Sequence, residues 1–538
     1  MRSKCRKLLI TIRSGFKKIQ NGIPPPFQFV SQDATWGDCR SWEKLRIQRD
    51  RILDYDVIVA GGNIGIFFAM TLQMKGYSVC LIEGDDLGSD QEDWHVSMNE
   101  LQELKNLGIL SDDDIDDAVL TVLPGCRVGV CEIKGIKNLG VSSSILIDRV
   151  AQRFKTWGGT ILEQSPIMGV AISDYTGAAI DLGEGREPVT ANLVLDCIGS
   201  SSPMARQERY GKKPDGILAV VGSCASGFNK NTNKQGDLMH TNPKIEDKGK
   251  HGKQQYFWEA FPVSGQKKEG QSDVKTTYLY TYMDADKSRP SMETLMNDYW
   301  KMLSEYQPEI KNPVTDLNVE RVMFAYHPIY SDSPLKYSWS RMLAVDVQSP
   351  MIFGGISPLI RHIGRISNAV SEALETQCLH KDDLAQINAH FPGVVFSRMI
   401  AQSLAVEKDE DLDPAFFNRL FSANLKSMKD IGPRAINPFL RDVVRPDNLM
   451  ETFVRTVVTD PALIPQTIKH VGLPTFMKGV KEVSMMGLYG FLDSAVTPKM
   501  EKSMNDRPPR EAFRWRRQRE AWKVGSGNDY NTEASGNE

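Results

Sequence analysis

A single glutamate lies within a run of aromatic residues that could raise the pKa of its carboxyl group. Glu259 is flanked in sequence by Tyr256, Phe257, Trp258 and Phe261. Burial among apolar rings disfavours the charged carboxylate, so such a group keeps its proton near neutral pH and can act as a general acid. Ring faces can also stabilise a cation. The alternative is a strand glutamate paired with an arginine or lysine, with the aromatic residues serving as core.

A glycine-rich turn near the N-terminus indicates a second kind of chemistry, the binding of a dinucleotide. An apolar, β-branched run at 56–60 predicts a strand buried on both faces of a parallel sheet. The turn at 61–65 follows at once, then a predicted helix over 66–75 that a glycine ends, and a second strand over 78–82. This order brings a helix N-terminus to a pyrophosphate group. We therefore predict a dinucleotide-binding βαβ unit at about residues 54–83.

The turn matches the G-x-G-x-x-G fingerprint except at its first glycine. Ala60 occupies that position, where glycine usually makes the tight turn. We expect Gly62 to let the backbone approach the phosphates, Gly65 to let the helix pack on the strand, and Glu83 to bind the adenosine ribose. These residues and Gly61 form the predicted cofactor site. A βαβ unit with no nucleotide is the alternative, because a fold alone does not imply a ligand.

A second buried strand is predicted over 191–198, and it runs into a turn at Gly199. In two-part flavin folds such a strand returns the chain to the nucleotide domain after an excursion. A glycine at this point lets the backbone pass close to the cofactor. Gly199 therefore joins the predicted cofactor site.

The composition changes along the chain and suggests its division into parts. The predicted fold class is α/β, with a Rossmann-like FAD-binding domain, an inserted substrate domain and a helical C-terminal region. We expect a basic leader and linker over 1–53, the FAD/NAD(P)-binding fold over 54–379 with substrate-domain segments at about 206–340, a helical region over 380–498 and a polar, basic, disordered tail over 499–538.

The C-terminal third has features that suit peripheral contact with a membrane. The stretches 391–400 and 476–492 are apolar with few charges, and the tail alternates arginines with aromatic residues. Such segments can lie on an anionic lipid surface. Helix-on-helix core and a solvated tail are the alternatives. No stretch reaches the roughly 18 uninterrupted apolar residues of a spanning helix.

Charge and cysteine usage limit the function classes. The 68 acidic and 65 basic residues leave a net charge of −3, which gives no reason to expect nucleic acid as a partner. The eight cysteines form no Cys-x-x-Cys pair, as is typical of thiols in a reducing compartment, and we expect no metal site. Residues 1–32 contain basic but no acidic side chains, the bias of an organelle transit peptide or of a plain basic tail. Nothing in the sequence predicts an oligomeric state.

Several further segments, in order along the chain, match a known family. The most specific is Phe-Trp-Glu-Ala-Phe-Pro at 257–262. The others lie at 92–97, 213–216, 221–228, 255–256, 276–278, 330–335, 348–350, 353–355 and 437–444. Together these segments resemble the lycopene cyclase paralogues of cyanobacteria and plastids, the CruA/CruP type, with the CruP branch most similar. The likeness covers about residues 54–495.

The resemblance implies an FAD-binding fold and a part in carotenoid metabolism in the chloroplast, at a thylakoid or envelope surface. It implies a lipophilic, carotenoid-like substrate, with NAD(P)H as a candidate reductant of the flavin. The proton donor would be Glu259, which starts ring closure through a carbocation. The further cofactor residues that it implies are Asp346, Gly354 and Gly355. The residues that we place in the substrate pocket are Trp94, Phe257 and Trp258, with ordinary core as the alternative.

Two departures from the family pattern concern the cofactor. Relatives usually read Trp-Asn-Ile-Ser-Arg where this chain has Trp-His-Val-Ser-Met at 94–98. They also carry a Gly-Asp-x-x-Gly type of turn before Gln-Ser-Pro, where this chain has Ala-Val-Asp-Val-Gln at 344–348. With Ala60, three expected FAD contacts are altered. These departures favour a second hypothesis, a non-catalytic paralogue with a binding or regulatory role, and a flavin monooxygenase is a third.

Overall fold

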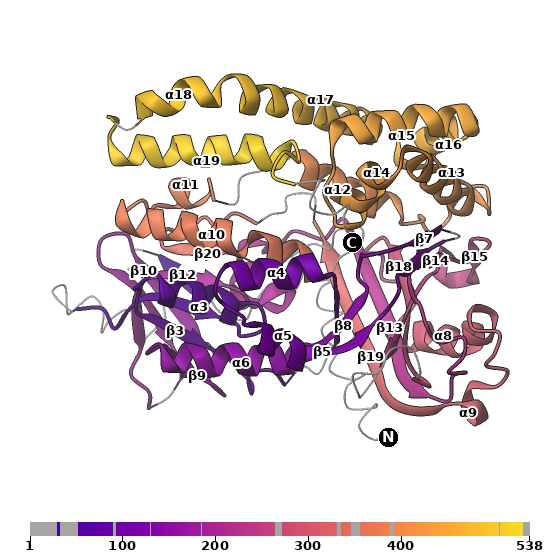
Figure 1. Ribbon diagram of the computed structural model, residues 1–538, viewed down its shortest axis with the longest axis horizontal. Coiled ribbons are helices and arrows are strands. Elements are labelled where there is room, and N and C mark those ends of the chain that lie inside the picture. The colour runs from indigo at the N-terminus through magenta and orange to yellow at the C-terminus, as the bar shows by residue number, and fades with distance from the viewer. Residues whose placement is uncertain are drawn as a thin grey trace.

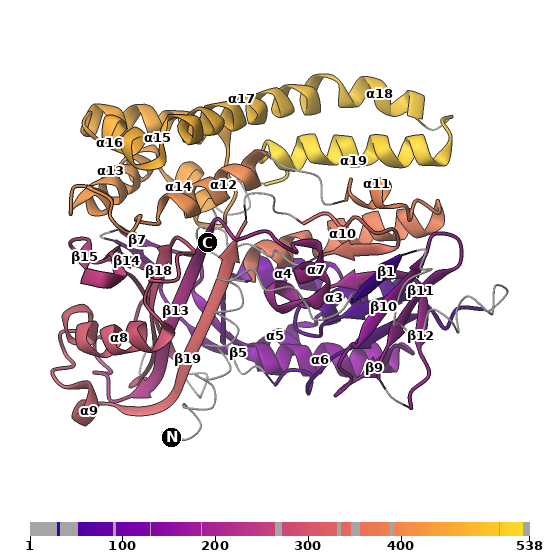
Figure 2. The same cartoon turned by 180° about the vertical axis from the view of Figure 1, so that it is seen from behind.

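The computed structural model describes residues 29–32, 52–89, 93–129, 131–183, 185–263, 272–330, 335–345, 356–387, 392–504 and 506–530. Three predicted cofactor residues, Asp346, Gly354 and Gly355, lie outside these ranges, as does most of the leader at 1–53. An α/β layer and a second sheet lie side by side, and a layer of C-terminal helices covers both (Figures 1 and 2).

A mixed sheet of eight strands forms the centre of the α/β layer. Its described strands are β1 (Val30–Gln32), β2 (Tyr55–Ala60), β3 (Val79–Ile82), β9 (Thr160–Leu162), β10 (Gly169–Ser173), β11 (Gly177–Asp181), β12 (Val189–Asp196) and β20 (Met342–Ala344). Their order is β1–β10–β11–β12–β2–β3–β9, with β20 also paired to β12. β12, β2, β3 and β9 are parallel, as the predicted βαβ unit requires.

Helices cover this sheet. They are α3 (Gly65–Met74), α4 (Met98–Asn106), α5 (Asp112–Ala118), α6 (Ser143–Thr156), α7 (Pro203–Glu208) and α10 (Ser357–Glu375). α3 is apolar on every side because α6, α10 and the sheet surround it. It ends at Gly76, whose φ of +91° lets Tyr77 N–H reach the carbonyl of Leu72. The predicted strand–helix–strand boundaries agree with the observed ones to within one residue.

The second sheet has seven described strands, in the order β19–β13–β18–β17–β14–β6–β7. Their bounds are β6 (Cys126–Val128), β7 (Cys131–Ile133), β13 (Gly216–Ser226), β14 (Gly236–Thr241), β17 (Phe257–Val263), β18 (Val274–Met283) and β19 (Asn318–Ile329). The long strands β13 and β19 run side by side in Figure 2. Helix α8 (Met292–Tyr306) packs on one face, and α9 (Pro313–Asp316) follows it. The sheet thus combines the expected region at 206–340 with two strands from 126–133.

A three-stranded sheet connects the two halves. It consists of β4 (Asp93–Val96), β8 (Leu139–Ser142) and β5 (Val119–Val122), and both β5 and β8 contact β17. The remaining short elements are η1 (Gly199–Ser201), β15 (Glu246–Asp247), η2 (Gly249–His251) and β16 (Lys253–Gln254).

The C-terminal region is helical, as predicted. Its helices are α11 (Lys381–Leu384), α12 (Pro392–Ser403), α13 (Phe416–Ile431), α14 (Pro433–Leu440), α15 (Pro446–Thr459), α16 (Leu463–Val471), α17 (Leu473–Ala495), α18 (Thr497–Met504) and α19 (Pro509–Gly525). Prolines stand in the first turn of α14, α15, α17 and α19, where the missing N–H costs nothing. Within the described residues, no helix is both long and apolar enough to cross a bilayer.

The expectation of a disordered tail is wrong for residues 509–525. Helix α19 packs against α17, α12 and α10, and its Phe513 is fully buried. Arginines of α19, which the sequence left either solvated or on a lipid surface, instead contact acids of the protein body. Arg510 and Arg514 pair with the buried carboxylate of Asp383, and Arg517 pairs with Glu372. Ion pairing with distant acids therefore explains a basic pattern that had suggested disorder.

Candidate functional site

The glycine turn lies where three parallel strands end. Gly61 N–H donates to the carbonyl of Ile82 at 2.9 Å, and the carbonyl of Ala60 accepts from Cys197 N–H at 2.8 Å. Gly61 has φ +95°, and a Cβ there would lie 2.8 Å from backbone atoms of Cys197 and Ile198. Glycine is thus required at position 61 because the backbone that follows β12 approaches it closely. The G-x-G-x-x-G fingerprint assigns no role to this position.

Gly65 marks the close packing of α3 on β2. A Cβ at this position would lie 2.8 Å from Cγ1 of Val59 and 3.3 Å from Cβ of Cys197. This close contact is the one that the fingerprint gives to its third glycine. Ala60, at the first position, is fully buried in the sheet.

Gly62 and Glu83 meet at the point where a dinucleotide would bind. Gly62 N–H donates to Oε2 of Glu83 at 2.6 Å, and Oε1 of the same carboxylate accepts from Gly84 N–H at 2.7 Å. A Cβ at Gly62 would lie 2.2 Å from Cδ1 of Leu87. Leu87 therefore covers the backbone that the phosphates would approach. Oε2 of Glu83 would lie 2.9 Å from the same Cβ, and because both neighbours are side-chain ends, rotamer changes can open the approach.

The residues present fit the adenosine and pyrophosphate half of FAD. Glu83 follows β3, where an acid is needed to bind the ribose. The glycine backbone at the start of α3 is where the phosphates would bind. Ser357, in the first turn of α10, has a buried hydroxyl without a hydrogen-bond partner among the described residues. α10 packs against α3, the helix that begins at the glycine turn.

Gly199 follows β12 with φ +80° and begins the short helix η1. Beside it, the fully buried Asp196 accepts hydrogen bonds from Ser202 Oγ at 2.5 Å and from the hydroxyl of Tyr337. Burial raises the pKa of this carboxyl group. Val345 N–H also donates to the carbonyl of Asp196 at 3.0 Å. The structure thus brings Gly199 close to the chain that leads into Asp346.

Glu259 lies on β17, partly buried, on the face of the sheet opposite to α8. It stands directly across from Tyr278 of β18 and two residues from Phe261 on the same face. Burial raises the pKa of its carboxyl group to about 7, although the charge of Lys137 lowers it. The pKa of Glu259 is therefore close to neutral pH, where its carboxyl group can both hold and release a proton.

The aromatic residues around Glu259 differ from those expected. Alternation along β17 places Tyr256 and Trp258 on the α8 face, where the indole N–H of Trp258 donates to Oδ1 of Asn242 at 2.7 Å. Phe257 shares the face of Glu259 but is fully buried among Tyr280, Tyr282 and the side chains of α13. The expectation that Trp258 lies beside Glu259 is therefore wrong, since its side chain is on the opposite face. Phe257 lies on the face of Glu259 within the core, and its pocket role stays a prediction.

Trp94 also points away from Glu259. Its ring lies 6.0 Å from that of Phe67 on α3 and packs against the α/β core. His95, its neighbour on β4, projects to the other side and stacks on Phe261 with ring centroids 3.7 Å apart. Trp94 thus packs against the α/β core, and its pocket role stays a prediction. His95 is the residue of β4 that contacts the Glu259 side of β17, through Phe261.

Two residues beside Glu259, His95 and Lys137, were missed by sequence reasoning. Burial, with a smaller contribution from the charge of Lys137, lowers the pKa of His95 to about 3, so the imidazole ring is neutral at physiological pH. Lys137 is itself buried, and its backbone has a φ of +45°. Its N–H donates a hydrogen bond to Ser97 Oγ at 3.0 Å. The alternation of β4 could have indicated His95. No motif marks Lys137, because only the tertiary fold brings it to β17.

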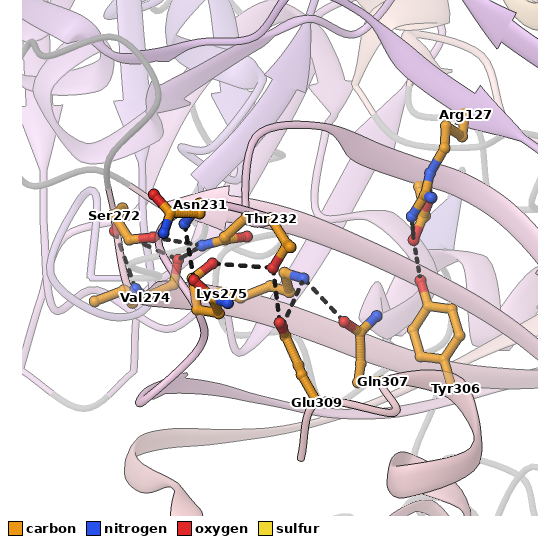
Figure 3. Close-up of polar contacts among 12 residues, drawn as sticks. Arg127, Asn231, Thr232, Ser272, Val274, Lys275, Tyr306, Gln307 and Glu309 are labelled. Atoms are coloured by element: carbon orange, nitrogen blue, oxygen red, sulfur yellow. Dashed lines mark hydrogen bonds and ion pairs between the residues drawn. The ribbon is translucent and has the colours of Figure 1, made fainter.

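A second group of polar residues lies beside the seven-stranded sheet (Figure 3), and its members Lys275, Gln307 and Asp237 are buried. Lys275 Nζ donates to Oε1 of Gln307 at 2.9 Å and lies 3.9 Å from Glu309, which accepts from Thr232 Oγ1 at 2.7 Å. Tyr306 and Arg127 both bind the carboxylate of Asp237. Because these side chains satisfy one another, we assign them to the stability of the sheet. In the described part of the chain, no group of three or more His, Cys, Asp and Glu could hold a metal ion.

Comparison with known proteins shows the fold but no specific family. No family model matches the chain. No curated protein matches it either. The solved structures that it resembles include the halogenase PltM with a Leu-to-Tyr substitution in complex with FAD, at 11% identity and a TM-score of 0.52, over 88% of this chain and 99% of that one. The same halogenase with phloroglucinol and FAD aligns at 12% identity and a TM-score of 0.52, over 89% and 99%.

These likenesses extend over both sheets and into the C-terminal helices. Because the identity is far below 25%, they establish the architecture alone. The resemblance to lycopene cyclase paralogues, and the roles of the site residues, stay predictions. The chain has an α/β, Rossmann-like FAD-binding fold, with mixed sheets and a helical C-terminal region.

Proposed function

We propose that this chain is a flavoenzyme of the lycopene cyclase type, which binds FAD and acts on a carotenoid-like polyene in the plastid. The observation that supports this most is the Glu259 carboxyl group, whose pKa burial raises to about 7. Phe261 and Tyr278 are aromatic residues on the same side of the sheet as Glu259. An acid that is half protonated near neutral pH, beside aromatic rings, suits the protonation of an alkene.

The proposed chemistry starts with transfer of the Glu259 proton to one carbon of a C=C bond. The electron pair of that bond forms the new C–H bond and leaves a carbocation on the neighbouring carbon. A second C=C bond attacks this cation and closes the ring, and loss of a proton from an adjacent carbon restores a double bond. The product is an isomer of the substrate, so the atoms and electrons balance without an external oxidant.

The residues beside Glu259 have distinct tasks in this scheme. Neutral His95 adds no further positive charge to that of Lys137 near the developing cation, because burial is the main cause that lowers its pKa to about 3. Lys137 stabilises the carboxylate that remains after proton transfer, since its charge lowers the pKa of Glu259. FAD, when bound, supplies a flavin ring that can hold or release a hydride, and NAD(P)H is a candidate for its reduction.

The test of this function is the Glu259→Gln variant, which keeps shape and hydrogen bonding but removes the acidic proton. General acid catalysis is worth about a hundred- to ten-thousand-fold in rate, so conversion of lycopene under reducing conditions should fall by that range. Glu320→Gln, at an exposed site on β19 of the same sheet, is the matched control and should retain activity. Both proteins must carry equal amounts of flavin. A Glu259→Gln variant as active as the parent would exclude the role.

A non-catalytic paralogue is the second candidate, and a specific contact favours it. Leu87 covers the backbone of Gly62, where the phosphates would approach, and Ala60 replaces the first glycine. The absorption spectrum of purified protein separates the two candidates. Flavin bands near one per chain support the enzyme, whereas protein without flavin that also fails to take up added FAD supports the paralogue.

A further inference from the structure

The helical layer exposes an unusual number of large apolar side chains. Of the 17 large hydrophobic residues exposed in the described part of the chain, nine lie between 450 and 491. Scattered single residues of this kind need no explanation, but a contiguous group marks a contact surface. We call this group the apolar face. Its members are Met450, Phe453, Val454, Val458, Leu473, Met477, Val480, Leu488 and Phe491.

The apolar face lies on the outer side of two adjacent helices. Along α17 its members recur at helical spacing on one side, from Leu473 to Phe491. The other side of α17 is the packed one, where Gly479 lies against Met399 and Phe396 of α12. α15 contacts α17 and supplies the remaining members. Figures 1 and 2 both show α15, α16 and α17 at the outer surface of the helical layer, away from the sheets.

The charges beside the apolar face are complementary to an anionic surface. Lys478 and Lys481 are exposed on the flank of the α17 stripe, and neither makes an ion pair with any residue that the structure describes. The two acids of α15 have basic partners, since Glu451 pairs with both Arg434 and Arg455, and Asp447 pairs with Arg445. Lysines at the edge of an apolar stripe can extend their ammonium groups to lipid phosphates while their stems stay in apolar contact.

We propose that the apolar face of α15 and α17 binds the surface of an anionic lipid bilayer, with both helices lying in the plane of the interface. No described helix can cross a membrane, so the contact is peripheral. This inference does not depend on the proposed function. It also replaces the basic tail as the lipid-binding element, because the arginines of α19 are held by Asp383 and Glu372.

Flotation of the full chain with vesicles tests this proposal. Vesicles of phosphatidylcholine with phosphatidylglycerol should carry the protein, and vesicles of phosphatidylcholine alone should carry less. Phe491→Glu and Val458→Glu, at sites 64% and 78% exposed, should each reduce the partition coefficient about tenfold or more, because each places a charge at the apolar boundary. Phe491→Leu should retain binding. Val314→Glu, at a site 88% exposed on α9, is the matched control and should bind like the parent.

The lysines give a second, independent readout. Lys478→Gln and Lys481→Gln should each weaken binding to the anionic vesicles about fivefold, since a lysine near such a surface contributes about 1 kcal/mol. Lys301→Gln, at an exposed site on α8, should have no effect. The proposal is overturned if the parent does not float, or if Val314→Glu loses as much as Phe491→Glu. A third outcome also overturns it: the protein does not float, light scattering shows a dimer, and the same glutamate variants dissociate that dimer. The apolar face would then join two copies of this chain.

Discussion

The ring of His95 stacks on the ring of Phe261 with centroids 3.7 Å apart and planes 22° from parallel. This contact joins β4 of the three-stranded sheet to β17 of the seven-stranded sheet, two residues from Glu259 on the same face. Lys137 is the cation that acts on both His95 and Glu259, and it lowers the pKa of each. Burial is the larger cause of both pKa shifts, and the charge of one buried lysine acts on both titratable groups at this junction.

Removal of the Lys137 charge should raise the pKa of Glu259 above its value of about 7, because burial would then act without an opposing charge. Lys137→Met tests this, with the infrared band of the protonated carboxyl group followed against pH and the Glu259→Gln variant as the blank. Lys134→Met, at an exposed site in the same segment, is the control. Any activity that needs the protonated acid should persist to higher pH in Lys137→Met. A midpoint that stays the same or falls would contradict the assignment.

The neighbouring glycines 61 and 62 should respond differently to alanine. Gly61→Ala meets backbone atoms of Cys197 and Ile198 at 2.8 Å with φ +95°, so the free energy of unfolding should fall by about 2 kcal/mol or more. Gly62→Ala meets only the side chains of Leu87 and Glu83, which can move, so stability should change less. Its effect should appear in FAD content instead. Denaturant unfolding and flavin absorbance measure the two effects, and equal destabilisation by both variants would refute this division.

The loss of flavin in Gly62→Ala has its own control. Leu87→Ala clears the side chain that covers Gly62 and should restore or increase FAD uptake in the double variant. If FAD content is the same in all of these proteins, the dinucleotide does not bind at this turn.

Stability should depend on pH through His470, whose side chain is 4% exposed. Its Nδ1 lies 2.6 Å from Oε1 of Glu410 and its Nε2 lies 2.7 Å from the carbonyl of Ser403, so both nitrogens face acceptors and the ring is doubly protonated. Burial alone would lower the pKa of His470, but the hydrogen bond and charge of Glu410 raise it above the ordinary 6.5. The stabilisation is therefore fully present below pH 6.5 and is lost as pH rises through the raised pKa.

The His470→Gln variant checks this sign. It should unfold about 2 kcal/mol more easily than the parent at pH 6, the scale of a hydrogen bond to a charged group. The difference between the two proteins should shrink towards pH 9 in denaturant titrations. A difference that is constant over this range would show that the ring is neutral.

The attachment of α19 should depend on Asp383. This buried carboxylate binds both Arg510 and Arg514, whereas the pair between Arg519 and Glu501 is exposed on both sides. Asp383→Asn should cost about 1–2 kcal/mol and increase hydrogen exchange in α19, because two charge-assisted contacts are lost. Glu501→Gln should cost less than about 1 kcal/mol, as exposed pairs do. Equal exchange in α19 of the two variants would argue against this clamp.

The local pattern of the sequence determined the βαβ unit and the helical character of the C-terminal region. An uninterrupted apolar run such as Val57–Ile58–Val59 is compatible with a strand buried on both faces, and Gly76 ends a helix by its own conformational freedom. Such features act over a few residues, so they can be read without knowledge of the rest of the chain.

Only the tertiary structure decided which side chains meet. Glu259 was found in sequence, but the partners assigned to it were its neighbours along the chain, and alternation on β17 sends Trp258 to the opposite face. The residues that do surround it come from β4 and from the turn that holds Lys137, more than a hundred positions away. The arginines of α19 looked like a solvated tail because Asp383 lies far back in the chain. Contacts between distant segments depend on how sheets and helices pack, which no local pattern specifies.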